Sequence, residues 1–261
     1  APQCIALGRF SFIFFRYDGW RCTQRKRRRM ETVYERGAFE RPAVLFDFDG
    51  TIADTGHAVL SISRRALAAR GYDLEAVGDL RQLIGPPLVD GFMLVTGGSR
   101  DEALELVDVY RGLFNEYVAP DDYPPFPGIP ELLRALSDRG TKIAVATSRL
   151  DETARQMIAA LDLPPFDIIA GRLEPGRATK ADCIRACLDG LGMGPSDAVM
   201  VGDRHHDVLG AHEVGLPCIG VWRDEPASAE LAGSGADGLC RDATELGWLL
   251  GVDGGFMERF A

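Results

Sequence analysis

The chain lacks the features that mark membrane-spanning and disulfide-stapled proteins. Its longest apolar run near either end is far shorter than the roughly 20 residues that a membrane helix needs, so no membrane span is expected. None of its six cysteines forms a Cys-x-x-Cys pair, which indicates reduced thiols in a cytosolic protein. It also shows no internal repeat, and no low-complexity segment from Met30 onward. We therefore expect a globular, cytoplasmic protein.

Positive charge is scarce outside one segment near the N-terminus. The formal net charge is −10, but residues 1–41 hold ten Lys/Arg against four Asp/Glu, a net of +6, which leaves −16 for residues 42–261. The acidic body argues against nucleic acid as a partner, although the basic run Arg25–Arg29 could bind nucleic acid or an anionic surface. More often such a run is a solvated tail. We expect residues 1–41 to be a basic, disordered extension, with residues 1–29 dispensable for folding.

The most informative motif is a short apolar strand that runs directly into two aspartates. The predicted strand Ala43–Phe46 holds Asp47 at its carboxyl end, where open parallel sheets bind their ligands, and Asp49 follows two residues later. Gly50 permits the chain to turn sharply there. A calcium loop counted from Asp47 fails on spacing, because its sixth residue is not glycine and its twelfth is not glutamate. The motif suggests phosphoryl chemistry, in which one carboxylate attacks and the other handles protons.

Strands and helices are predicted to alternate from Met30 onward. The expected strands are Ala43–Asp47, Lys142–Thr147, Ile168–Ala170, Ala198–Gly202, Cys218–Val221 and, more weakly, Gly238–Cys240. Helix-like apolar spacing is found in Pro130–Arg139, Asp151–Leu161, Lys180–Leu191 and Asp207–Val214. Apolar strands separated by helices predict an α/β fold with a doubly wound parallel sheet.

One interval breaks this alternation. Between Gly56 and Tyr123 the apolar spacing is almost entirely helical, and the proline-rich stretch Pro120–Pro130 follows it. We expect residues 56–123 to be an inserted all-helical cap, with the hinges near Asp54 and in the proline-rich stretch. Residues 42–55 and 124–261 would then form the α/β core.

Two further motifs carry groups that can bind phosphate. Thr147 and Ser148 lie at the end of the second predicted strand, where a hydroxyl and backbone N–H groups can bind phosphate oxygens. A helix cap is an equally good interpretation of this pair. Lys180 begins a predicted helix and could supply a positive charge to a phosphoryl group or to a carboxylate. A lysine at that position is usually only a surface residue.

The fourth motif adds two more acids at a strand end. Asp203 and Asp207 follow the predicted strand Ala198–Gly202. Together with Asp47 and Asp49 they would repel one another unless a hard cation lies among them, and Mg²⁺ prefers such carboxylate oxygens. The adjacent histidines His205 and His206 suggest zinc, but oxygen ligands dominate the site. Magnesium is therefore the expected cofactor.

Taken in order, the four motifs resemble those of the haloacid dehalogenase superfamily, in its phosphoglycolate phosphatase-like branch with a helical cap. The most specific segments are FDFDGTIADT at residues 46–55 and VGDRHHDVLGA at residues 201–211, and the resemblance extends over about residues 43–250. It implies a Rossmann-like core, and a phosphatase that acts on small phosphorylated metabolites through an aspartyl-phosphate.

The resemblance also implies a role for each motif residue. Asp47 would be the nucleophile, and Asp49 the general acid and then base, with a raised pKa in a closed site. Phosphate would be bound by the side chains or backbone of Thr147, Ser148 and Lys180. The resemblance implies that Mg²⁺ is held by these groups: Asp47, the backbone carbonyl of Asp49, Asp203 and, directly or through a neighbour, Asp207.

Other functions share this set of residues. A sugar phosphomutase, a pyrophosphatase and a 5'-nucleotidase could use the same site, and each would be separated by its product or substrate. A binding protein without turnover is a weaker alternative, since all the expected acids are present. Nucleic-acid binding through the basic N-terminal run is a third hypothesis.

Overall fold

A computed structural model describes residues 34–84, 86–252 and 255 of the protein. The basic run Arg25–Arg29 and the rest of residues 1–33 lie outside the described residues. Residues 34–41 were expected to be disordered, but they are part of the fold. Phe39 is buried, and the backbone N–H groups of Gly37 and Phe39 donate to the carbonyls of Trp248 and Leu249. The folded part therefore begins earlier than the predicted boundary at residue 41, because the buried Phe39 side chain holds this turn against the core.

A six-stranded parallel sheet forms the centre of the protein, in the order β3-β2-β1-β4-β5-β6. The strands are β1 (Ala43–Phe46), β2 (Lys142–Leu150), β3 (Ile168–Arg172), β4 (Ala198–Gly202), β5 (Cys218–Val221) and β6 (Gly238–Cys240). All six predicted strands are present, and the doubly wound parallel sheet is confirmed. β1 lies between β2 and β4, so the chain reverses its direction of winding at the strand that carries the first motif.

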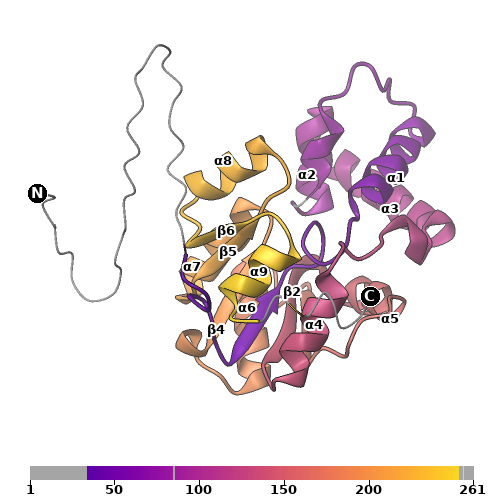
Figure 1. The fold of residues 1–261 in the computed structure, drawn as a ribbon. Coiled ribbons are helices and arrows are strands. Elements are labelled where there is room, and N and C mark those ends of the chain that lie inside the picture. The colour runs from indigo at the N-terminus through magenta and orange to yellow at the C-terminus, as the bar shows by residue number, and fades with distance from the viewer. Residues whose placement is uncertain (1–33, 85, 253–254, 256–261) are drawn as a thin grey trace, which may run out of the picture. The chain divides into compact units, whose positions relative to one another are not determined.

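Helices follow most strands and cover the sheet (Figure 1). The helices are α1 (Gly56–Ala69), α2 (Leu88–Thr96), α3 (Arg100–Tyr117), α4 (Ile129–Asp138), α5 (Asp151–Ala159), α6 (Lys180–Leu191), α7 (His205–Val214), α8 (Glu225–Gly233) and α9 (Ala243–Leu249). Short 3₁₀ turns span Leu80–Leu83, Pro120–Asp122 and Pro195–Asp197. The sequence pattern predicted four of the core helices but not α8 or α9, whose apolar faces are short.

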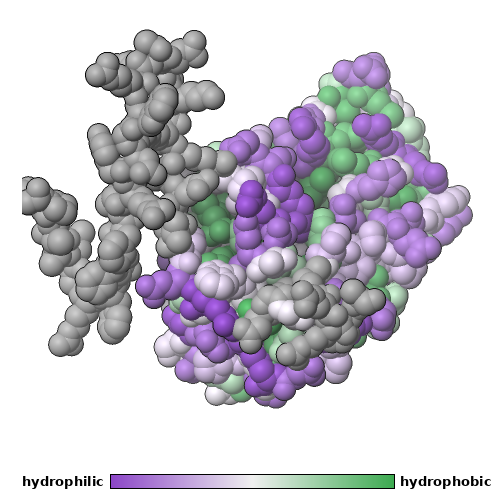
Figure 2. Space-filling model, viewed as in Figure 1, coloured by the Kyte–Doolittle hydropathy of each residue, from purple (hydrophilic) through white to green (hydrophobic). Residues whose placement is uncertain are grey.

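The insertion between β1 and β2 is helical, as expected. Figure 1 shows α1, α2 and α3 grouped together, apart from the sheet. Within this group α3 begins with a capping box, in which the Ser99 hydroxyl accepts from the Glu102 N–H and the Glu102 carboxylate accepts from the Ser99 N–H. Figure 2 shows apolar side chains at the surface of this part, and mostly polar side chains over the rest of the same face.

The core has one layer on each face of the sheet. Alternate residues along a strand point to opposite faces, so Val44 and Phe46 pack on the side of α4, while Ala43 and Leu45 pack against α6 and α7. The four described cysteines are free and buried. Cys183 and Cys187 donate their thiols to carbonyls of β2, which accounts for them as packing residues. Among the described residues, none of the helices has the length and apolar character needed to cross a bilayer.

β2 and β3 extend further than the sequence predicted. After a register shift beyond Ala146, Leu150 pairs with Arg172. This extension carries Arg149, Leu150 and Arg172 past the carboxyl edge of the central strands. Three side chains that the sequence pattern did not single out are thereby brought to the site described below.

The packing predicts how strongly two leucines contribute to the free energy of unfolding. Leu132 on α4 is fully buried, whereas Leu94 on α2 is 64% exposed. We expect Leu132→Ala to lower the free energy of unfolding by about 2–5 kcal/mol, because it leaves a cavity in the core. Leu94→Ala should change it by no more than about 0.5 kcal/mol. Urea unfolding of both variants checks this, and equal losses would contradict the described core.

Candidate active site

Asp47 is held at the carboxyl edge of the sheet by its neighbouring strand. Its backbone N–H donates to the carbonyl of Val201 on β4 at 2.8 Å, and its side chain is buried. β4 ends one residue before Asp203, so two acids leave adjacent parallel strands at the same edge. The first and fourth motifs therefore meet in space although about 150 residues separate them.

Lys180 joins the third motif to this pair of acids. A capping box formed by Thr179 and Asp182 fixes the start of α6. From there the Lys180 Nζ lies 2.8 Å from Oδ1 of Asp47, 2.8 Å from Oδ1 of Asp207 and 3.0 Å from the carbonyl oxygen of Ala146. The ammonium group donates a hydrogen bond to the Ala146 carbonyl and forms ion pairs with the two carboxylates. The structure thus brings Lys180, which the sequence pattern alone left open as an ordinary surface lysine, to the centre of the site.

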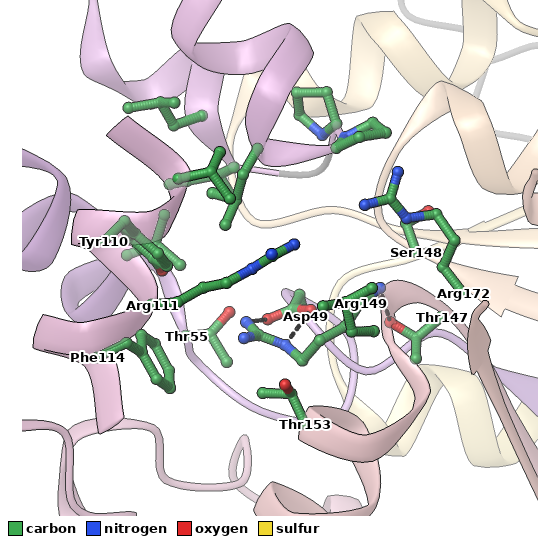
Figure 3. Close-up of a pocket in the computed structure, with 18 of the residues that line it drawn as sticks. Asp49, Thr55, Tyr110, Arg111, Phe114, Thr147, Ser148, Arg149, Thr153 and Arg172 are labelled. Carbon is green, nitrogen blue, oxygen red and sulfur yellow. Dashed lines mark hydrogen bonds and ion pairs between the residues drawn. The ribbon is translucent and has the colours of Figure 1, made fainter. Parts of the chain in front are cut away.

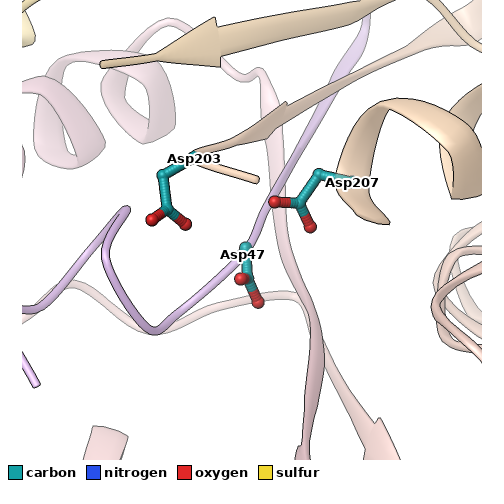
Figure 4. Close-up of side chains that lie close together, drawn as sticks. All are labelled: Asp47, Asp203 and Asp207. Atoms are coloured by element: carbon teal, nitrogen blue, oxygen red, sulfur yellow. The ribbon is translucent and has the colours of Figure 1, made fainter. Parts of the chain in front are cut away.

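Three carboxylates gather around this lysine. One oxygen each from Asp47, Asp203 and Asp207 lies within 4.8 Å of the others, and Figure 4 shows the three groups close together. Burial raises the pKa of Asp47 to about 7, against the opposing pull of Lys180. Burial, and then the charges of Asp207 and Asp47, raise the pKa of Asp203 well above its ordinary value. The cluster is short of positive charge, and its all-oxygen donor set suits a hard divalent cation such as Mg²⁺.

Asp207 is the most enclosed of the three acids. It is 1% exposed, its Oδ2 accepts from the backbone N–H of Arg204 at 3.1 Å, and its Oδ1 faces Lys180. A Cβ at Gly202 would overlap the Asp207 side chain, so glycine is required there for α7 to approach β4. Oδ2 thus accepts a hydrogen bond, whereas Oδ1 forms an ion pair with Lys180 and has no hydrogen-bond partner.

A tight turn closes the first motif over Asp203. Gly50 has φ +77°, and a Cβ at this position would overlap the Asp203 carboxylate. Its N–H donates to the carbonyl of Ala53 at 2.9 Å, and the Thr51 hydroxyl donates to Oδ1 of Asp203 at 3.3 Å. Only glycine satisfies both the left-handed backbone and the close approach.

Asp49 differs from its expected state. Arg149 binds it with two parallel hydrogen bonds, from Nε at 3.0 Å to one carboxylate oxygen and from the terminal nitrogen Nη2 to the other (Figure 3). Burial favours the neutral acid, but the charge and hydrogen bonds of Arg149 outweigh it, so the pKa of Asp49 is lowered. The raised pKa that the sequence led us to expect is wrong for this arrangement, because the prediction left out the arginine two residues after Thr147.

Thr147 and Ser148 lie where the second motif was expected to act. Thr147 is buried, and its hydroxyl accepts from the Arg149 N–H at 3.2 Å. Both residues line the same cavity as Asp47 and Asp49. The capping alternative is not supported, since α5 begins at Asp151 and its N-cap residue is Leu150, with no side-chain cap.

The cavity above these groups has a volume of about 150 Å³. The core lines it with Asp47, Asp49, Thr147, Ser148, Arg149, Leu150, Thr153 and Arg172. The inserted helices and their connections line it with Thr55, Val59, Leu83, Ile84, Pro86, Pro87, Leu88, Val89, Val107, Tyr110, Arg111, Phe114 and Asn115. The insertion supplies this lining from the segment before α2 and from α3 (Figure 3). Tyr110, Phe114 and Arg111, Asn115 are two i, i+4 pairs, a spacing that could have revealed this face of α3.

The adjacent histidines are not part of the acidic cluster. His205 Nδ1 lies 2.7 Å from Oε1 of Glu230, and the same oxygen accepts from the His205 backbone N–H at 3.0 Å. The imidazole rings of His205 and His206 lie against each other with centroids 3.7 Å apart and their planes tilted by 43°. Among the described residues, the group that could hold a metal ion consists of aspartates alone.

Removing the bridging lysine should destabilise the fold. Burial opposes the charge on Lys180, but Asp207 and Asp47 outweigh it and raise its pKa. Lys180→Met leaves buried carboxylates without their partner, and we expect the free energy of unfolding without added metal to fall by about 3–5 kcal/mol. The control is Lys142→Met, which breaks a half-exposed pair with Asp167 and should cost less than about 1 kcal/mol. Denaturant unfolding measures both, and equal losses would contradict the bridging role.

Comparison with known proteins gives a consistent result. The family described as haloacid dehalogenase-like hydrolase matches residues 44–221. A 5'-nucleotidase of Pseudomonas aeruginosa is 36% identical over 217 residues, which cover 80% of this chain and 95% of that protein. A phosphoglycolate phosphatase of Caulobacter vibrioides is 29% identical over 193 residues, covering 70% and 81%. A crystal structure of a predicted phosphatase from Clostridium acetobutylicum superposes with a TM-score of 0.71 at 31% identity, over 79% of this chain and 96% of the other.

Proposed function

Because the chain belongs to the haloacid dehalogenase-like hydrolases and is a phosphatase of that family, we propose that it hydrolyses small phosphorylated metabolites through an aspartyl-phosphate on Asp47. The observation that carries this proposal is the position of Asp47. It is buried at the end of a central strand, lies 2.8 Å from the Lys180 ammonium group and lines a cavity with Thr147 and Ser148. A nucleophilic carboxylate needs all three features: fixed geometry, a neutralising charge and access to substrate.

In the proposed reaction Asp47 attacks phosphorus, and the leaving oxygen departs on the opposite side. Lys180 offsets the repulsion between the carboxylate and the phosphate dianion, and the Thr147 hydroxyl and Ser148 bind the phosphoryl oxygens. Asp49 donates a proton to the leaving oxygen and then takes one from the water that hydrolyses the acyl phosphate. For the first of these steps Asp49 must be released from Arg149, so we infer that this ion pair opens when substrate binds.

We propose that Mg²⁺ binds among the acids of the cluster. Asp47, Asp203 and the backbone carbonyl of Asp49 would hold it, and it would supply positive charge to the transferring phosphoryl group. Asp207 would hold the cation directly or through Lys180, since its Oδ1 contacts Lys180 and has no hydrogen-bond partner. Residues 56–123 would act as a cap that excludes water from the closed cavity.

Several substrate classes fit this mechanism. Phosphoglycolate is one, since a relative of that name covers most of the chain. A nucleoside 5'-monophosphate is a second candidate, supported by the 36% identity to a protein named 5'-nucleotidase. Pyrophosphate hydrolysis and sugar phosphate mutation would use the same groups. A cytoplasmic location also remains a prediction, and the four free, buried thiols are in keeping with it.

Replacing the proposed nucleophile should abolish turnover. Asp47→Asn keeps the size of the side chain and removes its nucleophilic charge, so we expect phosphate release to fall at least about 10³-fold. Phosphate release from a panel of phosphomonoesters with Mg²⁺ measures the loss. The matched control is Asp189→Asn, at an exposed position on α6, which should keep wild-type rates. Comparable turnover in the Asp47 variant would refute the assignment.

Metal binding should be visible without any substrate. We expect Mg²⁺ at a hundredfold excess over its Kd to raise the unfolding temperature by about 5–10 °C, because it binds only the folded cluster. Asp203→Asn should remove most of this rise, and Asp189→Asn should keep it. Thermal unfolding with and without Mg²⁺ measures the effect. A rise that survives Asp203→Asn would show that the metal binds elsewhere.

A further inference from the structure

Two arginines line the cavity beyond the groups that the proposed reaction uses. Arg111 belongs to α3 and Arg172 ends β3. Both also line a second, neighbouring cavity of about 450 Å³, so they lie at the boundary between the two spaces. Figure 3 shows Arg111 reaching into the inner cavity from α3, while Arg172 lies beside Ser148 on the facing side.

The protein only weakly neutralises these two guanidinium groups. Among the described residues, Arg111 forms its ion pair with Asp108 at 4.0 Å, and the Asp108 side chain is 83% exposed. Arg172 pairs with Glu174 at 3.1 Å, but the Glu174 side chain is 63% exposed, which makes the pair a weak one. The Nε of Arg172 is buried and has no hydrogen-bond partner. This donor is left unsatisfied by the protein, so its hydrogen bonding does not neutralise the guanidinium group further.

The other cations of the site already have strong partners. Lys180 lies between Asp47 and Asp207, and Arg149 binds Asp49 with two hydrogen bonds. Among the charged groups that line the inner cavity, Arg111, Arg149 and Arg172 outnumber Asp47 and Asp49, so Arg111 and Arg172 leave an excess of positive charge there. A guanidinium pair of this kind suits a carboxylate or a phosphate group.

We propose, on the basis of the function proposed above, that Arg111 and Arg172 bind a second anionic group carried by the leaving group. The substrates are then small phosphate esters or anhydrides whose leaving group bears a carboxylate or a phosphate. Arg172 is supplied by the core and Arg111 by the inserted helices, so such a substrate bridges the two. A nucleoside monophosphate has an uncharged leaving group and leaves both arginines without a partner.

The first test uses the wild-type full chain and a matched pair of esters. Phosphoglycolate and 2-hydroxyethyl phosphate are similar in size, but only the first has a carboxylate on its leaving group. Charge-assisted hydrogen bonds predict a kcat/KM that is about tenfold to a hundredfold higher for phosphoglycolate. Pyrophosphate and adenosine 5'-monophosphate complete the panel. Preference for phosphoglycolate over its neutral partner identifies a carboxylate, and preference for pyrophosphate over both identifies a phosphate.

Equal or higher kcat/KM for the neutral ester, or for the nucleotide, with neither anionic substrate preferred, would overturn the inference while leaving the phosphatase function intact. Release of phosphate from no member of the panel would overturn the proposed function itself. The two failures are thus distinguishable in one experiment.

The second test removes one arginine at a time. In Arg111→Gln and Arg172→Gln the ratio of kcat/KM for the preferred anionic substrate to that for 2-hydroxyethyl phosphate should fall about tenfold or more. A ratio measured within one variant does not depend on the fraction of enzyme that is correctly folded. The control is Arg64→Gln, an equal change of charge at an exposed position of α1 that lines neither cavity. An unchanged ratio in both test variants, or an equal fall in the control, would overturn the assignment.

Discussion

The ion pairs of one buried lysine organise this site. Lys180 contacts two aspartates from two different motifs and a carbonyl of a third segment, so its ammonium group fixes β1, β2 and the start of α7 relative to one another. The lysine itself depends on the capping box that begins α6 at that residue. Three buried carboxylates so close together destabilise the fold unless positive charge lies beside them, and one lysine cannot neutralise all three. The remaining negative charge is what makes the cluster suitable for a divalent cation.

Two close approaches of the backbone make this clustering possible. Gly50 and Gly202 each lie where a Cβ would overlap an aspartate of the cluster, Asp203 in the first case and Asp207 in the second. Above the acids, a small cavity is lined by side chains of α3 and of the connection before α2. The space around the acids is therefore set by these close approaches and by side chains of the insertion.

The sequence predicted the features that depend on short stretches of the chain, namely the strands and the order of the motifs. Apolar runs located all six strands, and the order of the motifs located Asp47, Thr147 and Lys180 at one edge of the sheet. It did not predict the ion pair between Asp49 and Arg149, because such a pairing depends on β2 continuing past Thr147 with a shifted register. Arg111 and Arg172 were missed for a similar reason. Each is an ordinary surface-type residue in its own segment, and only the tertiary arrangement turns both toward the cavity.

The most direct test of the account is to trap the covalent intermediate. The enzyme is mixed with Mg²⁺ and its best substrate, quenched in acid within one turnover, digested and analysed by mass spectrometry for a phosphoryl group. We expect one phosphoryl group on the peptide that contains Asp47, stable in acid and lost at alkaline pH as an acyl phosphate is. Turnover with no phosphorylated enzyme at any quench time, or a phosphoryl group on a different residue, would contradict the assignment of Asp47 as the nucleophile.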